Sequence, residues 1–376
     1  MSRVLDNLTV AFDELAGKRV GLVGNQTSVL QGMTHLADAL VRADSINLVA
    51  LFAPEHGFYG EMDAQISSGT DARTGLPIHS LYGRSRRPSC EMLGDVDVLL
   101  FSIQDVGVRF YTYISTMYHC MEAVTHSGVG FVVVDRPNPI TGTRLEGNVS
   151  ERTFSSFVAV RPLPIRHGMT IGELAMMFKT VDEMSVDLTV VKMDTWERRQ
   201  WFDETELPWV IPSPAMPNLD TVNVYPGTCL YEGMNISLGR GTRRPFELIG
   251  APWIDAFALS DAVNDLGLPG TFFRPAYFVP MGSTHEGERC CGVQIHVMDR
   301  EVFEPVNVAM HLLEEIRRLY SDRFEWGDPD RIDRKFGTDV VRKGFEAGKR
   351  AEEFLEEWRD ERVSFEEVRR EFLIYT

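Results

Sequence analysis

The sequence predicts an α/β fold with a doubly wound, mostly parallel sheet. Short apolar runs alternate with helical patterns along the first part of the chain, which is the order that βαβ units produce. The chain has 376 residues, more than one hydrophobic core usually holds. The pattern also changes after about Thr141. We therefore expect two domains, over residues 1–150 and 151–376.

In the first domain, strand-like and helix-like segments follow one another. A helix over residues 34–42, with Thr34 as its N-cap, follows the first strand, and a helix that ends near Thr125 precedes the last one. The four apolar runs that we interpret as buried strands cover residues 18–24, 47–52, 95–101 and 130–135.

The second domain begins with a helix that Thr170 and Glu173 would open as a capping box. The proline-rich segment 208–217 is too broken for regular structure. Strands are expected at residues 187–193, 271–279 and 292–298. Helices are expected at residues 252–266, 302–320, 335–347 and 351–373.

Polar, Gly- and Pro-rich stretches follow three of the predicted strands. They carry Glu55, His56 and Glu61 after the second strand, Asp105 after the third and Asp135 after the fourth. Ligands of open α/β sheets bind at the carboxyl ends of strands, so these stretches predict a site there. The alternative is structural: Glu55 would cap a helix and His56 would fill a packed corner.

Composition and charge exclude several classes of partner. The net charge of −17 argues against nucleic acid or an anionic membrane as a partner. The N-terminus shows no apolar signal-peptide region, and no run of about 20 apolar residues suggests a membrane span. Five cysteines without CxxC spacing predict neither a disulfide framework nor structural zinc. The cytoplasm is the compartment we expect.

Carboxylates, aromatic residues and arginines dominate the polar stretches, and this combination is typical of glycoside hydrolysis, in which two acids flank the scissile bond. GxSxG, HExxH, Walker and GxGxxG motifs are all absent. We therefore expect no cofactor, and the spacing of His56, His79 and His167 matches no specific metal site. Arginines in the loop 239–247 suggest a clamp for an anion, although they could equally pair with surplus acids at the surface.

A series of motifs along nearly the whole chain carries a family resemblance. They are PEHGFYG, SLYGRSRRP, DVLLFSIQDVGVRFYTYIS, VVVDRPNPITG with LEGN, PIRHGMTIGELA, PSPAMPNLDT, VYPGTCLYEGMNISLGRGTRRPFELIGAPWID and GVQIHV. In this order the chain resembles the NamZ-type exo-β-N-acetylmuramidases, glycoside hydrolase family 171, formerly a domain of unknown function. The resemblance implies a Rossmann-like catalytic domain, a smaller α/β ancillary domain and a site in the cleft between them.

The resemblance also implies an activity and a set of site residues. The activity is release of terminal N-acetylmuramic acid from the non-reducing end of peptidoglycan fragments. Glu55 would be the catalytic acid, His56 would orient it, and Asp105 is a further catalytic candidate. The substrate-binding candidates in matching motifs are Arg109, Tyr111, Asp135, Arg136, Asn138, Glu146, His167, Asn218, Tyr225, Glu232, Arg240, Arg244 and Glu247.

Two departures from the family pattern bear on these expectations. Arg243 stands where the pattern has threonine or serine, and this chain lacks the export signal that many relatives carry. The second departure favours turnover of imported fragments. Because muramic acid carries a lactyl carboxylate, we expect Arg240 or Arg244 to hold it.

The sequence is also compatible with two other functions. A nucleotide- or phosphate-binding enzyme would need a glycine fingerprint after residues 18–24, which is missing. A non-catalytic receptor for muropeptides or sugars would share the cleft. Retaining, inverting and substrate-assisted mechanisms are all open, as are glycan length and oligomeric state. Carboxyl groups about 5–5.5 Å apart would indicate retention, and about 6.5–9.5 Å inversion.

Overall fold

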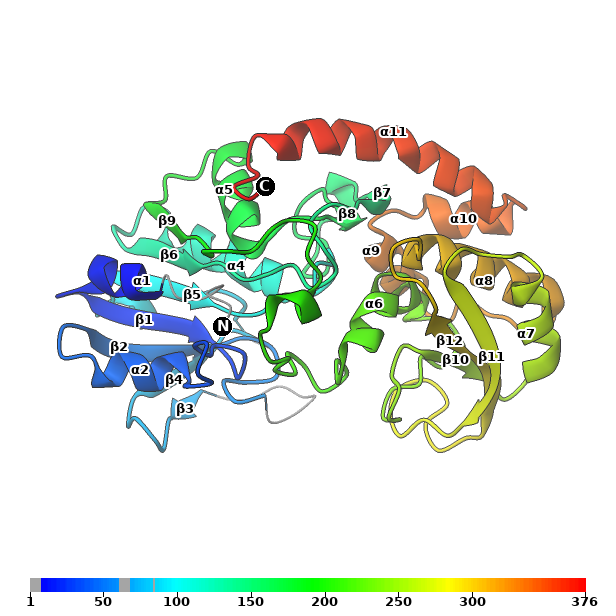
Figure 1. The fold of residues 1–376 in the computed structure, drawn as a ribbon, viewed down its shortest axis with the longest axis horizontal. Helices are drawn as coiled ribbons and strands as arrows, with labels where there is room; N and C mark the ends of the chain where they lie inside the picture. Colours follow the sequence, from blue (N-terminus) through cyan, green and yellow to red (C-terminus); the bar gives the residue numbers. More distant parts are fainter. Residues whose placement is uncertain (1–7, 61–67, 84) are drawn as a thin grey trace.

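The computed structural model describes residues 8–60, 68–83 and 85–376, so Glu61 lies outside the described residues. Two α/β units stand side by side, and helix α11 (Ala351–Arg370) runs above both, from the second unit back to the first (Figure 1). The chain therefore ends on its own N-terminal unit. Within the described ranges, no helix is both long and apolar enough to cross a membrane.

The first unit is built on a seven-stranded sheet in the order β3-β4-β2-β1-β5-β6-β9. All neighbouring strands are parallel except β3 and β4, which confirms the predicted mostly parallel sheet. The strands are β1 (Arg19–Gly24), β2 (Asn47–Ala53), β3 (Gly69–Thr70), β4 (Pro77–Ser80), β5 (Val98–Ser102), β6 (Gly130–Val134) and β9 (Leu188–Val191).

Helices cover both faces of this sheet, because successive strand residues point to opposite sides. Leu22 of β1 packs in one hydrophobic cluster with Leu40, whereas its neighbour Val23 packs in the other with Ile114. Strands buried on both faces need apolar residues at almost every position, as observed here. The helices of this unit are α1 (Leu8–Leu15), α2 (Leu36–Arg42), α3 (Cys90–Leu93), α4 (Tyr113–Val124) and α5 (Ile171–Val181).

The strand order reverses at β1, which lies between β2 and β5. The loops that follow β2 and β5 therefore leave the same edge of the sheet on the two sides of β1. This is the position at which open α/β sheets bind ligands. The loop after β2 begins with Pro54 and Glu55, and the loop after β5 leads through Asp105 to α4.

The first unit extends beyond residue 150, where the sequence analysis placed the domain boundary. Strand β9 pairs with β6, and α5 contacts both strands. A parallel strand needs such a crossover helix, so β6, α5 and β9 form one βαβ unit. Between β6 and α5 the chain forms a two-stranded ladder of β7 (Glu146–Val149) and β8 (Pro164–Arg166) and a 3-10 turn, η1 (Arg152–Phe154).

The second unit contains an antiparallel sheet in the order β10-β12-β11. Helices α6 and α8 pack so closely that a Cβ atom on Gly227 would overlap the carbonyl oxygen of Pro305. The elements that follow β9 along the chain and precede α11 are η2 (Phe202–Thr205), α6 (Leu219–Thr228), η3 (Cys229–Tyr231), β10 (Leu248–Ala251), α7 (Ala256–Asn264), β11 (Thr271–Phe278), β12 (Cys290–Val297), α8 (Pro305–Leu319), α9 (Pro329–Phe336) and α10 (Val340–Glu346).

Local predictions are partly confirmed. The capping box of Thr170 and Glu173 is present at the start of α5. Thr34 was the wrong cap for α2: the helix begins one residue later than that requires, and the His35 ring accepts the Ala37 N–H at 3.2 Å. The single helix predicted over residues 335–347 is also wrong, because Gly337 at φ 68° ends α9 before α10 begins.

The two units are joined through the buried side chain of Arg109. Its Nη1 atom donates to the carbonyl oxygens of Asn148 at 2.7 Å and Leu163 at 2.6 Å. Its Nη2 atom donates to the carbonyl oxygens of Lys335 at 3.0 Å and Phe336 at 2.7 Å, at the end of α9. One side chain thus binds carbonyl groups of both units.

We predict that Arg109→Met lowers the free energy of unfolding by at least about 3 kcal/mol, because four buried carbonyl oxygens each lose the hydrogen bond that the guanidinium group donates. Urea unfolding measures this. Arg199→Met is the control, since that side chain is 81% exposed and pairs only with Glu197 among the described residues. Equal unfolding midpoints for the two variants would contradict the prediction.

Candidate active site

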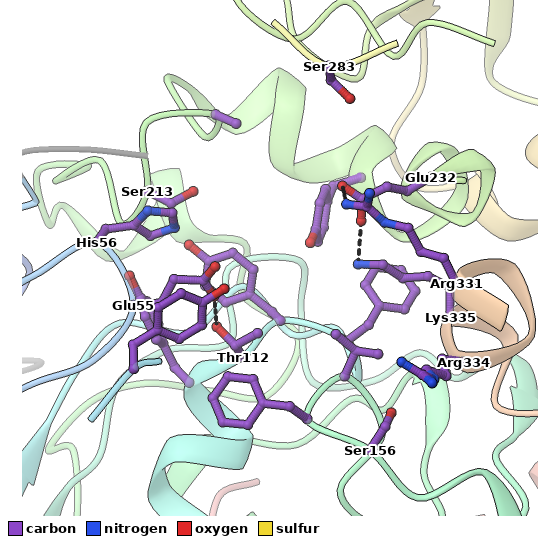
Figure 2. A pocket seen from close by; sticks show the side chains of 18 of the residues that line it. Glu55, His56, Thr112, Ser156, Ser213, Glu232, Ser283, Arg331, Arg334 and Lys335 are labelled. Atoms are coloured by element: carbon purple, nitrogen blue, oxygen red, sulfur yellow. Dashed lines mark hydrogen bonds and ion pairs between the residues drawn. The ribbon is translucent and has the colours of Figure 1, made fainter. Parts of the chain in front are cut away.

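A cavity of about 720 Å³ lies between the two units, a volume suited to a sugar-sized ligand. Figure 2 shows Glu55 and His56 on one side and Glu232, Arg331 and Lys335 on the other. The lining residues come from both units: Glu55, His56, Tyr82, Arg86, Phe110, Tyr111, Thr112, Tyr113, Ser156, Phe157, Val158, Ser213, Ala215, Met216, Tyr225, Glu232, Arg240, Phe246, Ser283, Asp328, Asp330, Arg331, Arg334 and Lys335.

Glu55 reaches the cavity from the sharp turn after β2. His56 and Gly57 follow it with φ angles of 72° and 82°, in the left-handed region that a non-glycine residue rarely adopts. The half-buried Glu55 accepts a hydrogen bond on Oε2 from Thr112 Oγ1 at 2.7 Å. Thr112 is the N-cap residue of α4, so the loops after β2 and β5 meet at this bond.

Tyrosines form the apolar wall next to Glu55. Tyr111 comes from the loop before α4, Tyr113 is the first residue of α4, and Tyr225 comes from α6. The rings of Tyr113 and Tyr225 make edge-to-face contacts with the Tyr111 ring, at centroid distances of 4.9 Å and 5.9 Å. Burial, together with the neighbouring Tyr113, raises the pKa of Tyr111 well above its ordinary value. The phenol therefore stays protonated and can act as a hydrogen-bond donor.

The opposite wall is cationic. The carboxylate of Glu232 forms ion pairs with Lys335 Nζ at 2.8 Å and with the guanidinium groups of Arg240 and Arg331, each at 3.0 Å. Burial would raise the pKa of Glu232, but the attraction of Lys335, Arg240 and Arg331 outweighs it and lowers the pKa to about 2. One carboxylate thus remains ionised among three cations. The Lys335 ammonium group also lies 5.1 Å from the centroid of the Phe110 ring.

Asp105 lies outside the cavity lining, behind the surface where we expected a second catalytic group. It is buried, and its Oδ2 accepts the Gly107 N–H at 2.7 Å. Burial raises the pKa of Asp105 to about 7, although hydrogen bonds from the N–H groups of Gly107 and Val106 act to lower it. His167 is also buried, with Nε2 3.9 Å from Asp105 Oδ2, and burial lowers the pKa of His167 to about 3.

Only part of the predicted substrate-binding set lines the cavity. Tyr111, Tyr225, Glu232 and Arg240 do so. The other nine lie outside the lining, and most of them have polar partners that belong to the fold: Arg109, Asp135, Arg136, Asn138, Glu146, His167, Asn218, Arg244 and Glu247.

The candidate residues that follow β6 make hydrogen bonds within the fold and not to the cavity. Asp135 accepts hydrogen bonds from Thr170 Oγ1 at 2.7 Å, Gly172 N at 2.8 Å and Tyr375 Oη at 2.7 Å. Arg136 donates to Val29 O and Ser102 Oγ, and Asn138 donates to Met169 O. Glu146 binds the Arg166 guanidinium group and accepts the Val306 N–H at 3.1 Å. These groups tie the sheet, α5 and the C-terminus together.

The residues around α6 are used similarly. Asn218 is the N-cap of α6 and accepts the Thr221 N–H at 2.9 Å. Arg244 pairs with Asp220 at 3.1 Å and with Glu247 at 3.2 Å, and Glu247 also accepts from Thr221 Oγ1 at 3.0 Å. The expected clamp residue Arg244 therefore already has two carboxylate partners outside the cavity lining.

The cations that α9 and the loop after β4 bring to the cavity were not among the site residues predicted from the sequence. Arg331, Arg334 and Lys335 are spaced i, i+3 and i+4, which places them on one face of α9. Arg86 lies with its guanidinium carbon 4.4 Å from the centroid of the Phe157 ring. The segment PDRIDRKF carried the spacing signal, but its single predicted helix began at residue 335. Among the described residues, no group of three or more His, Cys, Asp or Glu is arranged to hold a metal ion.

Comparison with known proteins adds the family. A model described as exo-beta-N-acetylmuramidase NamZ, N-terminal, matches residues 20–220, and its C-terminal counterpart matches residues 223–375. The chain belongs to the NamZ family of exo-β-N-acetylmuramidases. It is 45% identical over 364 residues to the peptidoglycan beta-N-acetylmuramidase NamZ of Bacillus subtilis (strain 168), covering 96% of this chain and 88% of that protein.

Two solved structures support the fold of this NamZ family member. Both are DUF1343 family proteins from Bacteroides fragilis NCTC 9343. One aligns with a TM-score of 0.93 at 36% identity, and the other with 0.81 at 30% identity. In each case the alignment covers 100% of this chain and 99% of the other. This chain thus shares its Rossmann-like arrangement with a second, smaller α/β unit with both of these proteins.

The ion pairs of Glu232 predict a pH-dependent stability. The folded-state pKa of about 2 lies below the ordinary value of 4.5, so the contribution is complete above pH 4.5 and is lost as the pH falls through 2. We expect Glu232→Gln to lower the free energy of unfolding at pH 7 by at least about 3 kcal/mol. The difference from the unaltered protein should shrink between about pH 5 and pH 2. Denaturant unfolding across this range measures it, and a constant difference would contradict the assignment.

Proposed function

We propose that this chain is an exo-acting glycoside hydrolase that releases terminal N-acetylmuramic acid from the non-reducing end of peptidoglycan fragments. Membership of the NamZ family and 45% identity to a peptidoglycan β-N-acetylmuramidase support this activity. The observation that carries it is the position of Glu55, a carboxylic acid in a cavity with tyrosines beside it and cations opposite.

Glu55 is the proposed proton donor. It would transfer its proton to the glycosidic oxygen as the bond between that oxygen and the sugar C1 breaks. Water would supply the hydroxyl group that C1 gains, and the remaining proton of that water would return Glu55 to its protonated form. The products are free N-acetylmuramic acid and the glycan shortened by one sugar. Thr112 is a positioning residue, because its hydroxyl group holds Oε2 of Glu55 in place at 2.7 Å. His56, next in the turn, is proposed to orient the same carboxyl group.

The remaining predicted site residues divide by location. Tyr111, Tyr225 and Arg240 line the cavity, and we propose that they contact the sugar. Asp105 is proposed to act through the loop that it shapes: its carboxylate holds the Gly107 N–H at 2.7 Å, and Gly107 has a φ angle of 79°. This turn leads the chain toward Tyr111 and Thr112. Asp105 would thus position the tyrosine wall.

We expect Glu55→Gln to lower kcat at least about a hundredfold, the usual scale for general acid catalysis, with a smaller effect on KM. Release of the chromophore from an aryl β-N-acetylmuraminide measures it. The matched control is Glu91→Gln in α3, an exposed glutamate outside the cavity lining, which should keep full activity.

Near-normal kcat in Glu55→Gln would remove Glu55 from the catalytic role. No turnover of any aryl muraminide by the unaltered protein, with the free sugar still bound, would instead indicate a non-catalytic sugar-binding protein.

A further inference from the structure

The cavity concentrates positive charge in an acidic chain. The net charge of the whole chain is −17, yet five of the residues that line the cavity are basic: Arg86, Arg240, Arg331, Arg334 and Lys335. Three of these, Arg331, Arg334 and Lys335, belong to α9. A local cluster of this kind in an acidic protein favours an anionic ligand in the cavity.

Most of these cations already have partners. Lys335, Arg331 and Arg240 all bind the carboxylate of Glu232. Two further acids of this wall, Asp328 and Asp330, flank the start of α9. Asp328 is occupied, because its side chain accepts the Arg331 N–H at the helix N-terminus at 3.1 Å. Arg86 forms no ion pair with a described residue, but its guanidinium group lies against the Phe157 ring. On α9, the positive charge that a ligand could use belongs to the remaining cation.

Arg334 supplies that charge. Its side chain is exposed, lines the cavity and makes no hydrogen bond or ion pair with any residue that the structure describes, Asp330 one turn earlier included. Ser156 lines the same cavity, and its buried Oγ atom also has no hydrogen-bond partner in the described part of the chain. Figure 2 shows Arg334 and Ser156 both at the lower edge of the pocket, away from Glu55.

We propose that Arg334 and Ser156 bind the lactyl carboxylate that distinguishes N-acetylmuramic acid from N-acetylglucosamine. The inference rests on the proposed function and assigns its sugar specificity. A guanidinium group binds a carboxylate through two parallel N–H bonds, and a serine hydroxyl group can donate a third. A buried hydroxyl group without a partner is costly until a ligand supplies one.

The assignment replaces the residues that the sequence suggested. Arg244 binds Asp220 and Glu247 outside the cavity lining, and Arg240 binds Glu232 while its guanidinium carbon lies 4.9 Å from the centroid of the Phe246 ring. Either arginine would have to give up an existing ion pair before it could bind the carboxylate of a ligand. Arg331, held by Glu232, raises the positive potential one turn from Arg334 without giving up its own partner.

The test compares three aryl β-glycosides: N-acetylmuraminide, its uncharged lactyl amide, and N-acetylglucosaminide. In Arg334→Met we expect kcat/KM for the acid to fall roughly ten- to a hundredfold, the range for loss of a charged hydrogen-bond partner. The values for the amide and for the glucosaminide should change less than about threefold, because they carry no carboxylate. Arg334→Lys should restore part of the preference for the acid, and Ser156→Ala should lower it in the same direction.

Two comparisons keep the result specific. Arg199→Met, at a surface arginine outside the cavity lining, should leave all three values unchanged. Arg244→Met tests the alternative clamp directly. If Arg244→Met abolishes the preference for acid over amide and Arg334→Met does not, the assignment to Arg334 is overturned.

A binding measurement separates this inference from the proposed function. Calorimetry in the Glu55→Gln background should show that free N-acetylmuramic acid binds more tightly than its lactyl amide, and that Arg334→Met removes the difference. That result supports the carboxylate site even if the unaltered protein cleaves none of the glycosides, an outcome that would overturn only the hydrolase. An acid-over-amide difference that persists in Arg334→Met overturns the carboxylate site.

Discussion

The geometry of the site depends on one buried cation, the guanidinium group of Arg109. It has no carboxylate within ion-pair distance among the described residues, and burial lowers its pKa to about 9. Its stabilisation comes instead from carbonyl dipoles. Two of these belong to Lys335 and Phe336, at the carbonyl end of α9, where the helix dipole favours a positive charge. Asn148 adds a second bond to Phe336 O at 2.7 Å.

This contact sets the separation of charge across the cavity. The loop that carries Arg109 continues to Tyr111 and Thr112, next to Glu55, while α9 carries Arg331, Arg334 and Lys335. Arg109 therefore fixes the position of the wall that carries Glu55 relative to the wall that carries the cations. Glu232 has the matching role on the second wall, since it neutralises enough charge for Lys335 to stay buried.

The polar motifs of the sequence serve mainly to hold this frame together. Asp135 binds α5 through Gly172 N and the C-terminal segment through Tyr375 Oη. After α11 the chain returns to the first unit, where the hydroxyl group of Tyr375 donates a hydrogen bond to the buried carboxylate of Asp135. Burial raises the pKa of Asp135 to about 6, and its hydrogen bonds offset part of that cost. A family motif can therefore be demanded by folding as strongly as by catalysis.

The sequence by itself determined the doubly wound sheet, the capping box of α5 and the position of Glu55 at a strand end, because apolar periodicity and turn residues act over a few neighbouring positions. It also determined the family, through long motifs in a set order. Only the tertiary structure decided which polar residues reach the cavity. Asp105 and Arg244 have local patterns as suggestive as that of Glu55, yet their partners lie elsewhere. Arg334 faces the cavity because distant segments pack around Arg109, and no local pattern encodes a contact between parts of the chain so far apart.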